Sequence, residues 1–396
     1  MTKFLGALDL GSENIKFLLG AINSKSLTFV DYFKFSSQGV RKGSIEQPKK
    51  LIESLKDGFA KVLKKHAVLP SEICLAQTGS HIRSIEYEAM LPIGGLHHLI
   101  DKKDIESVNR LAKEKKLTDQ QLFIHHFKQY YTVDNKLVED PYGQPANHFG
   151  VHYRGLFGNA QNIKDAIFLT NQCGFRVKEL VFSGLASAMA TTSSMERENG
   201  ICVVDIGAEI TEFIAFKHQH AIAMGTLPVG GRNFTNDLYS GLRIHLDDSE
   251  RIKKERGIPL MESEAAESEF WAIGNQSIGD KRIKTKNVQI ILQARAQELF
   301  SFIQKTLNGA CSPEELMAGC VLTGGGALLK NIEKVAAQVF HCDCCVRGPL
   351  IGNASINAPS DSSCVGLLHF ALKQMSDGTS SHSHRPILRR LREWFS

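Results

Sequence analysis

Apolar and polar positions along the chain alternate in the two periods that distinguish helices from strands. Segment 47–66 carries apolar residues at helical spacing, whereas segment 73–78 is a short apolar run typical of a buried strand. Further helices are predicted over 101–115, 162–174, 185–192, 235–257, 288–307 and 327–338, and further strands over 123–133 and 320–322. This succession predicts a mixed α/β protein.

Two distant segments of the chain resemble each other. Residues 5–19 (LGALDLGSENIKFLL) and residues 201–215 (ICVVDIGAEITEFIA) each contain an apolar strand ending at Asp-x-Gly, a polar turn and a second apolar strand. A repeated strand hairpin indicates an internal duplication. We therefore expect two lobes, each opened by one copy of the hairpin.

Composition and charge narrow the classes of function. With 396 residues, of which 42% are hydrophobic and 22% charged, the chain is too long for one compact domain and ordinary for a globular protein. Much of the net charge of +5 lies in 385–396, which gives no support for nucleic-acid binding. Nine cysteines and a start without an apolar signal segment predict reduced thiols in the cytosol. No apolar run approaches the roughly 20 residues of a membrane-spanning helix.

One cysteine-rich segment contains residue types that bind metals. Residues 341–345 (HCDCC) have no second Cys or His pair at the spacing of a structural zinc site. Their alternation fits an ordinary strand, which is the interpretation that we favour.

The two Asp-x-Gly turns have the chemistry of an anion site. A backbone N–H approaches a phosphate oxygen most easily where no Cβ intervenes, and Gly11 and Gly207 offer such positions. Asp9 and Asp205 could orient Mg²⁺ through water, and Lys16 could neutralise phosphate charge. A single Asp-x-Gly is more often an ordinary turn, but its repetition favours a function.

A third glycine loop lies near the end of the chain. Segment 322–328 (LTGGGAL) sets three glycines between a strand and a helix, a shape that lets a ligand lie against the backbone. Taken alone, it fits a tight turn equally well. Gly230 and Gly231 form a fourth candidate. The order and spacing of the four loops together indicate a nucleotide cleft.

With these loops in place, the sequence resembles the actin-fold superfamily and, within it, the FtsA family of bacterial division proteins, which attach FtsZ filaments to the membrane. The resemblance covers nearly the whole chain. It rests on segments 7–12 (ALDLGS), 79–84 (GSHIRS), 203–207 (VVDIG), 228–231 (PVGG), 250–253 (ERIK), 321–328 (VLTGGGAL) and 365–368 (VGLL).

The resemblance implies an actin-like two-lobed α/β fold of duplicated ribonuclease-H-like domains, with an inserted FtsA-type subdomain and a C-terminal amphipathic helix. The implied division gives 1–84, 166–200 and 360–375 to the first lobe, 85–165 to the insert, 201–227 and 301–359 to the base of the second lobe, 228–300 to its tip, 376–384 to a linker and 385–396 to the helix. In the family, the insert is implicated in self-association and the tip in binding FtsZ.

The resemblance also implies which residues would hold ATP or ADP with Mg²⁺. The first phosphate loop would run from Asp9 to Lys16 and the second from Asp205 to Glu212, and no catalytic residue is assigned. The implied nucleotide-binding residues are Asp9, Gly11, Ser12, Glu13, Asn14, Lys16, Asp205, Gly207, Ala208, Gly230, Gly231, Glu250, Lys253, Gly324, Gly325 and Gly326, with Asp9 and Asp205 holding magnesium through water.

Two positions depart from the family pattern. Glu209 stands where a glycine is usual, and two like unit charges about 4 Å apart repel by about 4 kcal/mol at an effective dielectric near 20. Unless Glu209 turns away or binds magnesium, the γ-phosphate is disfavoured. Ser183 stands where an acidic residue usually acts on the attacking water. A hydroxyl is a poor base at neutral pH, so we expect little or no ATP hydrolysis.

The last segment, 385–396 (RPILRRLREWFS), has the pattern of an amphipathic helix. Its membrane-binding residues would be Ile387, Leu388, Leu391, Trp394 and Phe395 on the apolar face and Arg389, Arg390 and Arg392 around it. At about 1.5 Å per residue, it is too short to cross a hydrocarbon core of about 30 Å. We expect it to lie on an anionic membrane surface; packing on the protein's own core is the alternative.

The resemblance, together with the pattern of 385–396, implies a peripheral protein on the cytoplasmic face of the cell membrane, at the division site. The expected partners are FtsZ, other FtsA-like protomers, an anionic membrane surface and other division proteins, and no nucleic acid. One alternative is an actin-fold ATPase or sugar-kinase relative, which the missing carboxylate base and the tail disfavour. The other is a pilus-assembly-type adaptor at the inner membrane, which the insert and segment 79–84 disfavour.

Overall fold

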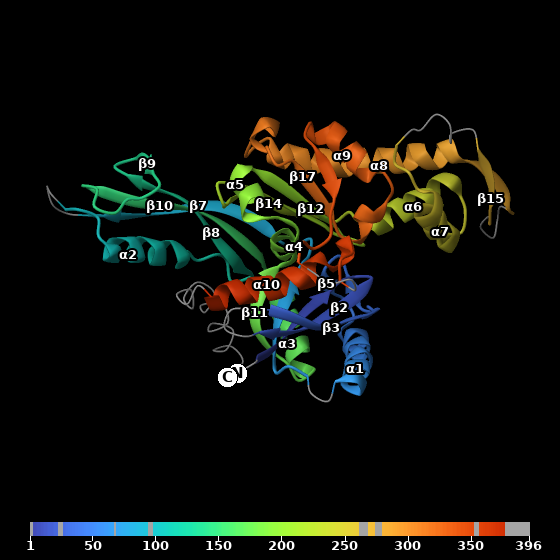
Figure 1. Ribbon diagram of the computed structural model, residues 1–396, viewed down its shortest axis with the longest axis horizontal. Helices are drawn as coiled ribbons and strands as arrows, with labels where there is room; N and C mark the ends of the chain where they lie inside the picture. Colours follow the sequence, from blue (N-terminus) through green and yellow to red (C-terminus); the bar gives the residue numbers. More distant parts are fainter. Residues whose placement is uncertain are drawn as a thin grey trace.

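The computed structural model describes residues 3–22, 27–66, 69–93, 98–260, 268–273, 279–351 and 356–376. Two five-stranded sheets form the centres of two lobes, and a four-stranded sheet extends to one side of them (Figure 1). The predicted amphipathic helix and the linker from residue 377 onward lie outside the described residues. Within the ranges given, no helix combines the length and the hydropathy needed to cross a membrane.

The first lobe is built on a sheet with the order β11-β6-β1-β2-β3. The first three strands of the chain are antiparallel neighbours, and β6 and β11 continue the sheet in parallel beside β1. The strand bounds are β1 Lys3–Leu10, β2 Asn14–Ile22, β3 Leu27–Ser36, β6 Glu72–Gln77 and β11 Arg176–Phe182. β6 is buried along its whole length, as its continuous apolar run predicts.

Helices cover this sheet and connect it to the second lobe. α1 (Pro48–Lys65) buries Leu51, Leu55 and Phe59, which confirms the helix predicted from their spacing. The other elements of the lobe are the ribbon β4 Val40–Arg41 and β5 Ser44–Ile45, and helices α3 Ala160–Gln172, α4 Ser183–Thr191 and α10 Ser362–Ser376. The short helix α5 Ser194–Asn199 follows α4 and packs on β13 (Thr211–Lys217) of the second lobe.

Two helices make the connections between the lobes, and they touch backbone to backbone. The chain leaves the first lobe through α4 and returns to it through α10 (Figure 1). A Cβ atom added to Gly366 on α10 would lie 1.7 Å from the carbonyl oxygen of Ala186 on α4. Only glycine allows this approach.

The second lobe repeats the topology of the first. Its sheet has the order β14-β13-β12-β17-β18, again with three antiparallel strands followed by two parallel ones. The strand bounds are β12 Ile201–Ile206, β13 Thr211–Lys217, β14 His220–Leu227, β17 Cys320–Thr323 and β18 Cys344–Val346. The hairpin registers match as well, because Asp9 pairs with Lys16 and Asp205 pairs with Glu212. The sequence repeat is thus a duplication of the fold.

Helices of the second lobe differ from two of the predictions. The bounds are α6 Gly231–Leu242, α7 Leu246–Arg256, α8 Thr285–Leu307 and α9 Ile332–Phe340, with the ribbon β15 Glu269–Ala272 and β16 Lys281–Lys284 at the far end. The helical stretch predicted over 235–257 consists of two helices, because Arg243 adopts a φ of 52° and separates α6 from α7. The prediction of a helix over 327–338 is wrong at its start: Asn331 has a φ of 62°, and α9 begins after it.

The insert between β6 and α3 forms its own sheet, with the order β7-β10-β8-β9. Its elements are β7 Arg83–Pro92, α2 Lys102–Lys113, β8 Gln121–Val133, β9 Lys136–Val138 and β10 His148–Asn159. α2 packs on this sheet, and Val108, Phe149 and Val151 belong to a buried cluster separate from the cores of the lobes.

The insert is hydrogen-bonded to both lobes. His125 of β8 accepts a hydrogen bond of 2.9 Å from the Phe182 N–H of the first lobe. On the other side, the Gln129 side chain donates to the Ala221 carbonyl at 3.2 Å, and the Ser84 hydroxyl donates to the Met224 carbonyl at 3.3 Å. β14, the edge strand of the second lobe, is therefore covered by the insert.

Candidate functional site

The two hairpin turns have the same local geometry. A Cβ on Gly11 would lie 2.7 Å from the Asn14 carbonyl oxygen, and one on Gly207 would lie 2.8 Å from that of Ile210. Neither turn accepts a side chain at its glycine without moving. Ser12 lies half-buried in the first turn.

A buried ion pair stands at the first turn. The Lys16 ammonium lies 3.1 Å from Asp9 Oδ2, and the Ser363 hydroxyl donates to the same oxygen at 2.6 Å. Burial opposes the charge of Lys16, but the carboxylates of Asp9 and Asp205 outweigh it and raise the pKa of Lys16. Lys16 is thus a fixed positive charge beside the turn.

Asp205 brings the second and third glycine loops together. Its carboxylate accepts a hydrogen bond from the Ser187 hydroxyl at 2.5 Å, and burial raises its pKa. A Cβ on Gly324, whose φ is 83°, would lie 2.2 Å from Asp205 Oδ1. Gly326 packs on Ile206, whereas a Cβ on Gly325 would meet no atom of the described residues within 4 Å. The third loop therefore presents its middle glycine to open space.

The fourth glycine loop lies against the second. The N–H groups of Gly231 and Arg232 donate to the carbonyls of Gly207 and Ala208 at 2.9 and 2.8 Å. A Cβ on Gly230 would also collide with Ala208. The start of α6 is therefore fixed on the second glycine loop.

Glu250 and Lys253 lie together beside this helix start. Lys253 donates to the Gly231 carbonyl at 3.0 Å, to the Thr235 hydroxyl at 2.8 Å and to the Glu250 carboxylate at 2.6 Å. Partial burial disfavours the charge of Glu250, but hydrogen bonds from Lys253 and Thr235 outweigh it and lower the pKa of Glu250 to about 2. Glu250 and Lys253 therefore lie beside the fourth glycine loop, and their binding of a nucleotide stays a prediction.

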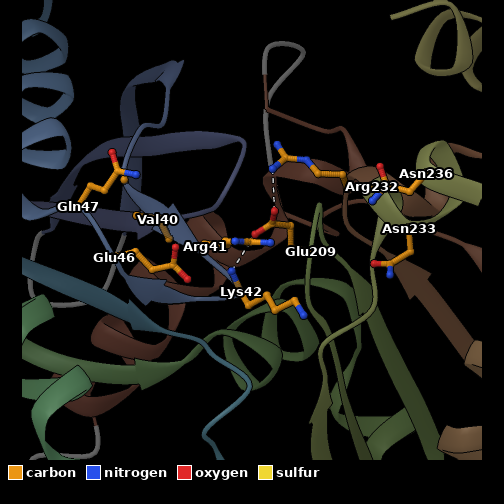
Figure 2. A pocket seen from close by; sticks show the side chains of 10 residues that line it. Val40, Arg41, Lys42, Glu46, Gln47, Glu209, Arg232, Asn233 and Asn236 are labelled. Carbon is orange, nitrogen blue, oxygen red and sulfur yellow. Dashed lines mark hydrogen bonds and ion pairs between the residues drawn. The ribbon is translucent and has the colours of Figure 1, made fainter. Parts of the chain in front are cut away.

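Glu209, which replaces the usual glycine of the second loop, reaches from the second lobe to the first. Its Oε2 accepts the backbone N–H of Lys42 at 2.7 Å, and its Oε1 accepts a hydrogen bond of 2.6 Å from Arg232. Arg232 also donates to Glu13 of the first loop at 2.7 Å. Figure 2 shows Glu209 between Arg232 and Lys42. Glu13 therefore binds an arginine of the second lobe.

A cavity of about 480 Å³ opens beside this carboxylate. Figure 2 shows side chains from both lobes around it. Its lining consists of Gly39, Val40, Arg41, Lys42, Glu46, Gln47, Glu209, Arg232, Asn233 and Asn236. The lining is mostly polar and charged, which suits a hydrophilic ligand better than an apolar one.

The position expected to activate water is neutral in this chain. Ser183 begins α4 and is buried, and Gly184 after it packs on Phe182. The nearby Glu212 is also buried, and burial together with the charge of Asp205 raises the pKa of Glu212 well above its usual value. This carboxyl group therefore resists ionisation.

The site residues that the sequence reasoning missed include Lys42, Ser187, Arg232 and Ser363. Lys42 takes part through its backbone, so its residue type carried no signal. Ser187 and Ser363 bind Asp205 and Asp9 from helices that are remote in sequence. Arg232 directly follows the two glycines of the fourth loop, and Ser363 lies two residues before segment 365–368, so both stood close to a recognised motif.

Two family models match separate parts of the chain. The model "Cell division protein FtsA" matches residues 202–366, and the model "SHS2 domain inserted in FTSA" matches residues 79–154. The FtsA proteins of Pseudomonas aeruginosa and Neisseria meningitidis are 26% and 24% identical to this chain. They cover 99% and 94% of this chain, which in turn covers 97% and 91% of theirs.

Solved structures show the same fold at low sequence identity. The PilM–PilN type IV pilus biogenesis complex matches with a TM-score of 0.63 and 14% identity, over 93% of this chain and 98% of that one. MreB5 of Spiroplasma citri bound to ADP matches with a TM-score of 0.56 and 13% identity, over 96% and 99%. The expected actin-like fold is confirmed. From its two family models, its full-length relatives and this fold, the chain belongs to the FtsA family of cell division proteins.

Proposed function

We propose that this chain attaches FtsZ filaments to the cytoplasmic face of the cell membrane at the division site. Residues 385–396 would bind anionic lipid, while the lobes and the insert would bind filaments and further copies of the chain. The observation that carries the proposal is the occurrence, in one chain, of the FtsA lobes, the SHS2 insert and a basic amphipathic C-terminal segment.

The cleft between the glycine loops is proposed to bind ATP or ADP. Two similar turns, a third loop with open space at Gly325 and the fixed charge of Lys16 support this assignment. The structure of MreB5, which has a similar fold, was solved with ADP. Backbone N–H groups in such turns and a nearby lysine are the usual partners of phosphate.

Magnesium is proposed to bind at the same site. Asp9 and Asp205 are carboxylates on the two loops, and such oxygens hold Mg²⁺ through its water shell. When bound, the ion would neutralise part of the phosphate charge. Asp9 and Lys16 would keep their pair, and Ser363 would fix the orientation of the Asp9 carboxylate.

Nucleotide turnover is proposed to be slow or absent, because Ser183 offers no carboxylate base. Phosphate release from ATP by the full-length protein measures this directly. The variant Ser183→Glu restores the acidic residue and provides the comparison. ATP hydrolysis by the unmodified chain that Asp205→Ala abolishes would contradict the proposal.

An exposed apolar patch at the tip of the second lobe is the proposed contact with FtsZ. Its residues are Leu246, Trp271 and Ile273, which are 46%, 64% and 59% exposed. The His245 N–H donates to the Ile273 carbonyl at 3.1 Å, which fixes β15 beside the start of α7. An exposed tryptophan in an apolar patch is a frequent centre of binding energy.

Sedimentation with FtsZ filaments and with lipid vesicles tests the proposal. The full chain should pellet with filaments and with anionic vesicles, whereas a chain lacking residues 385–396 should pellet with filaments only. Retention of the shortened chain on anionic vesicles would reject the anchor. A chain that pellets with vesicles but never with FtsZ would favour the pilus-type adaptor, for which the fold similarity to PilM is the present support.

A further inference from the structure

One carboxylate in the cleft is bound by both lobes at once. Glu209 receives the Lys42 N–H from the first lobe and the Arg232 guanidinium from the second. Only 8% of Glu209 is exposed, so the carboxylate lies largely out of water. A charge-assisted hydrogen bond in such surroundings is among the stronger ones. The two lobes are therefore joined through an anion that the chain itself supplies.

The donor from the first lobe is fixed by backbone packing. Lys42 has a φ of 47°, and its carbonyl accepts the Ser80 N–H at 3.3 Å. A Cβ on the next residue, Gly43, would lie 2.4 Å from the Gly79 Cα. The Lys42 N–H is thus held by a close contact between two turns, and its position does not depend on a flexible side chain.

The donor from the second lobe, Arg232, binds one glutamate on each of the two phosphate loops. One nitrogen of Arg232 binds Glu209 and another binds Glu13. The Glu13 side chain is 60% exposed, so its contribution is small. The buried Glu209 is the main partner. The planar fork of an arginine fits a carboxylate and a phosphate equally well.

We infer that Glu209 takes the place of a terminal phosphate, so that the cleft selects nucleoside diphosphates over triphosphates. The inference rests on the proposed binding of nucleotide in this cleft. A γ-phosphate between the loops would compete with Glu209 for the Arg232 guanidinium and the Lys42 N–H, and it would meet a like charge. A diphosphate is shorter and leaves the contacts of Glu209 in place. The same contacts hold the lobes together before any nucleotide binds.

The first measurement is the ratio of the dissociation constants for ATP and ADP, each with magnesium, in the full-length protein. The unmodified chain should bind ADP about tenfold more tightly than ATP, or better. Glu209→Gly should bring the ratio close to unity by strengthening ATP binding. Glu209→Gln, which keeps the size of the side chain but not its charge, should lie between them.

A matched variant controls for charge in the same cavity. Glu46 also lines it, and Glu46→Gln removes one negative charge without touching either phosphate loop. This variant should keep the unmodified ratio. Equal affinities in the unmodified chain, or a ratio that Glu209→Gly leaves unchanged, would overturn the selection. So would a failure of both the unmodified chain and Glu209→Gly to bind either nucleotide.

The second measurement needs no nucleotide, filament or membrane, so it stands apart from the proposed function. Hydrogen exchange of the Lys42 amide should be slow in the nucleotide-free chain and about tenfold faster or more in Glu209→Gly. Glu46→Gln should exchange like the unmodified chain. Equal exchange in all three proteins would overturn the joining role of Glu209, whatever filament or vesicle sedimentation shows.

Discussion

The Ser363 hydroxyl donates a hydrogen bond of 2.6 Å to the Asp9 carboxylate. Ser363 lies in the first turn of α10, and Asp9 lies near the end of β1, at the first glycine turn. Helix α10, which precedes the C-terminal segment, is therefore hydrogen-bonded directly to the buried Asp9 carboxylate. A change in the environment of Asp9 reaches α10 through a single bond.

The substitution Ser363→Ala tests this bond. It should lower the free energy of unfolding by about 1 to 3 kcal/mol, because a buried carboxylate loses one of its donors. Urea unfolding followed by circular dichroism measures the change. Ser240→Ala, on an exposed position of α6, is the control and should have little effect. Equal stability of the two variants would show that the bond contributes nothing.

Gly366→Ala should destabilise the protein although alanine is the better helix former. The added methyl group would overlap the Ala186 carbonyl and force α4 and α10 apart. Overpacking of this kind costs about 1 to 3 kcal/mol. Thermal unfolding should show a lower Tm. In Gly241→Ala the added methyl group meets the flexible end of Ile291, and a similar loss there would contradict the explanation.

Stability should depend on pH through Glu212. Its pKa in the folded chain is raised above the ordinary 4.5, so the folded state binds more protons than the unfolded state. Stability therefore falls as pH rises above 4.5. Glu212→Gln removes this dependence and should gain stability over the unmodified chain between about pH 5 and about pH 8. Urea midpoints across that range measure it, and a constant difference between the proteins would contradict the assignment.

Trp271→Ala should weaken binding to FtsZ filaments about tenfold while leaving the unfolding transition unchanged, because the side chain is exposed. Sedimentation over a range of filament concentrations gives the affinity. Met317→Ala removes another exposed apolar side chain of the second lobe and serves as the matched control. If both variants bind like the unmodified chain, the patch is not the filament contact.

Local patterns were sufficient to predict the hairpins and the glycine turns. Asp9 and Asp205 end strands whose alternation and turn residues are readable within a few positions, and the structure gives them matching registers. The repeat then supplied the two-lobed fold. The division of the chain into lobes at particular residues stays a prediction, as does the helix at 385–396.

Long-range pairs and unusual backbone conformations were not predictable in the same way. The partner of Glu209 is Arg232, but its second donor is a main-chain N–H far away in sequence, which no residue type announces. Arg243 adopts a left-handed conformation that its residue type does not favour, so the boundary between α6 and α7 carried no visible signal, whereas Asn331 is of a type that adopts this conformation more readily. Such conformations are settled by tertiary packing and not by local preference.

The hydrogen bonds of the insert to both lobes have a mechanical consequence. A load applied to β8 acts on the first lobe through His125 and on the second through Gln129 at the same time. Separating the lobes therefore requires shearing the insert from the β14 edge. A molecule that holds the insert against β14 would therefore stiffen the connection between the two lobes, and one that pulls the insert away would loosen it.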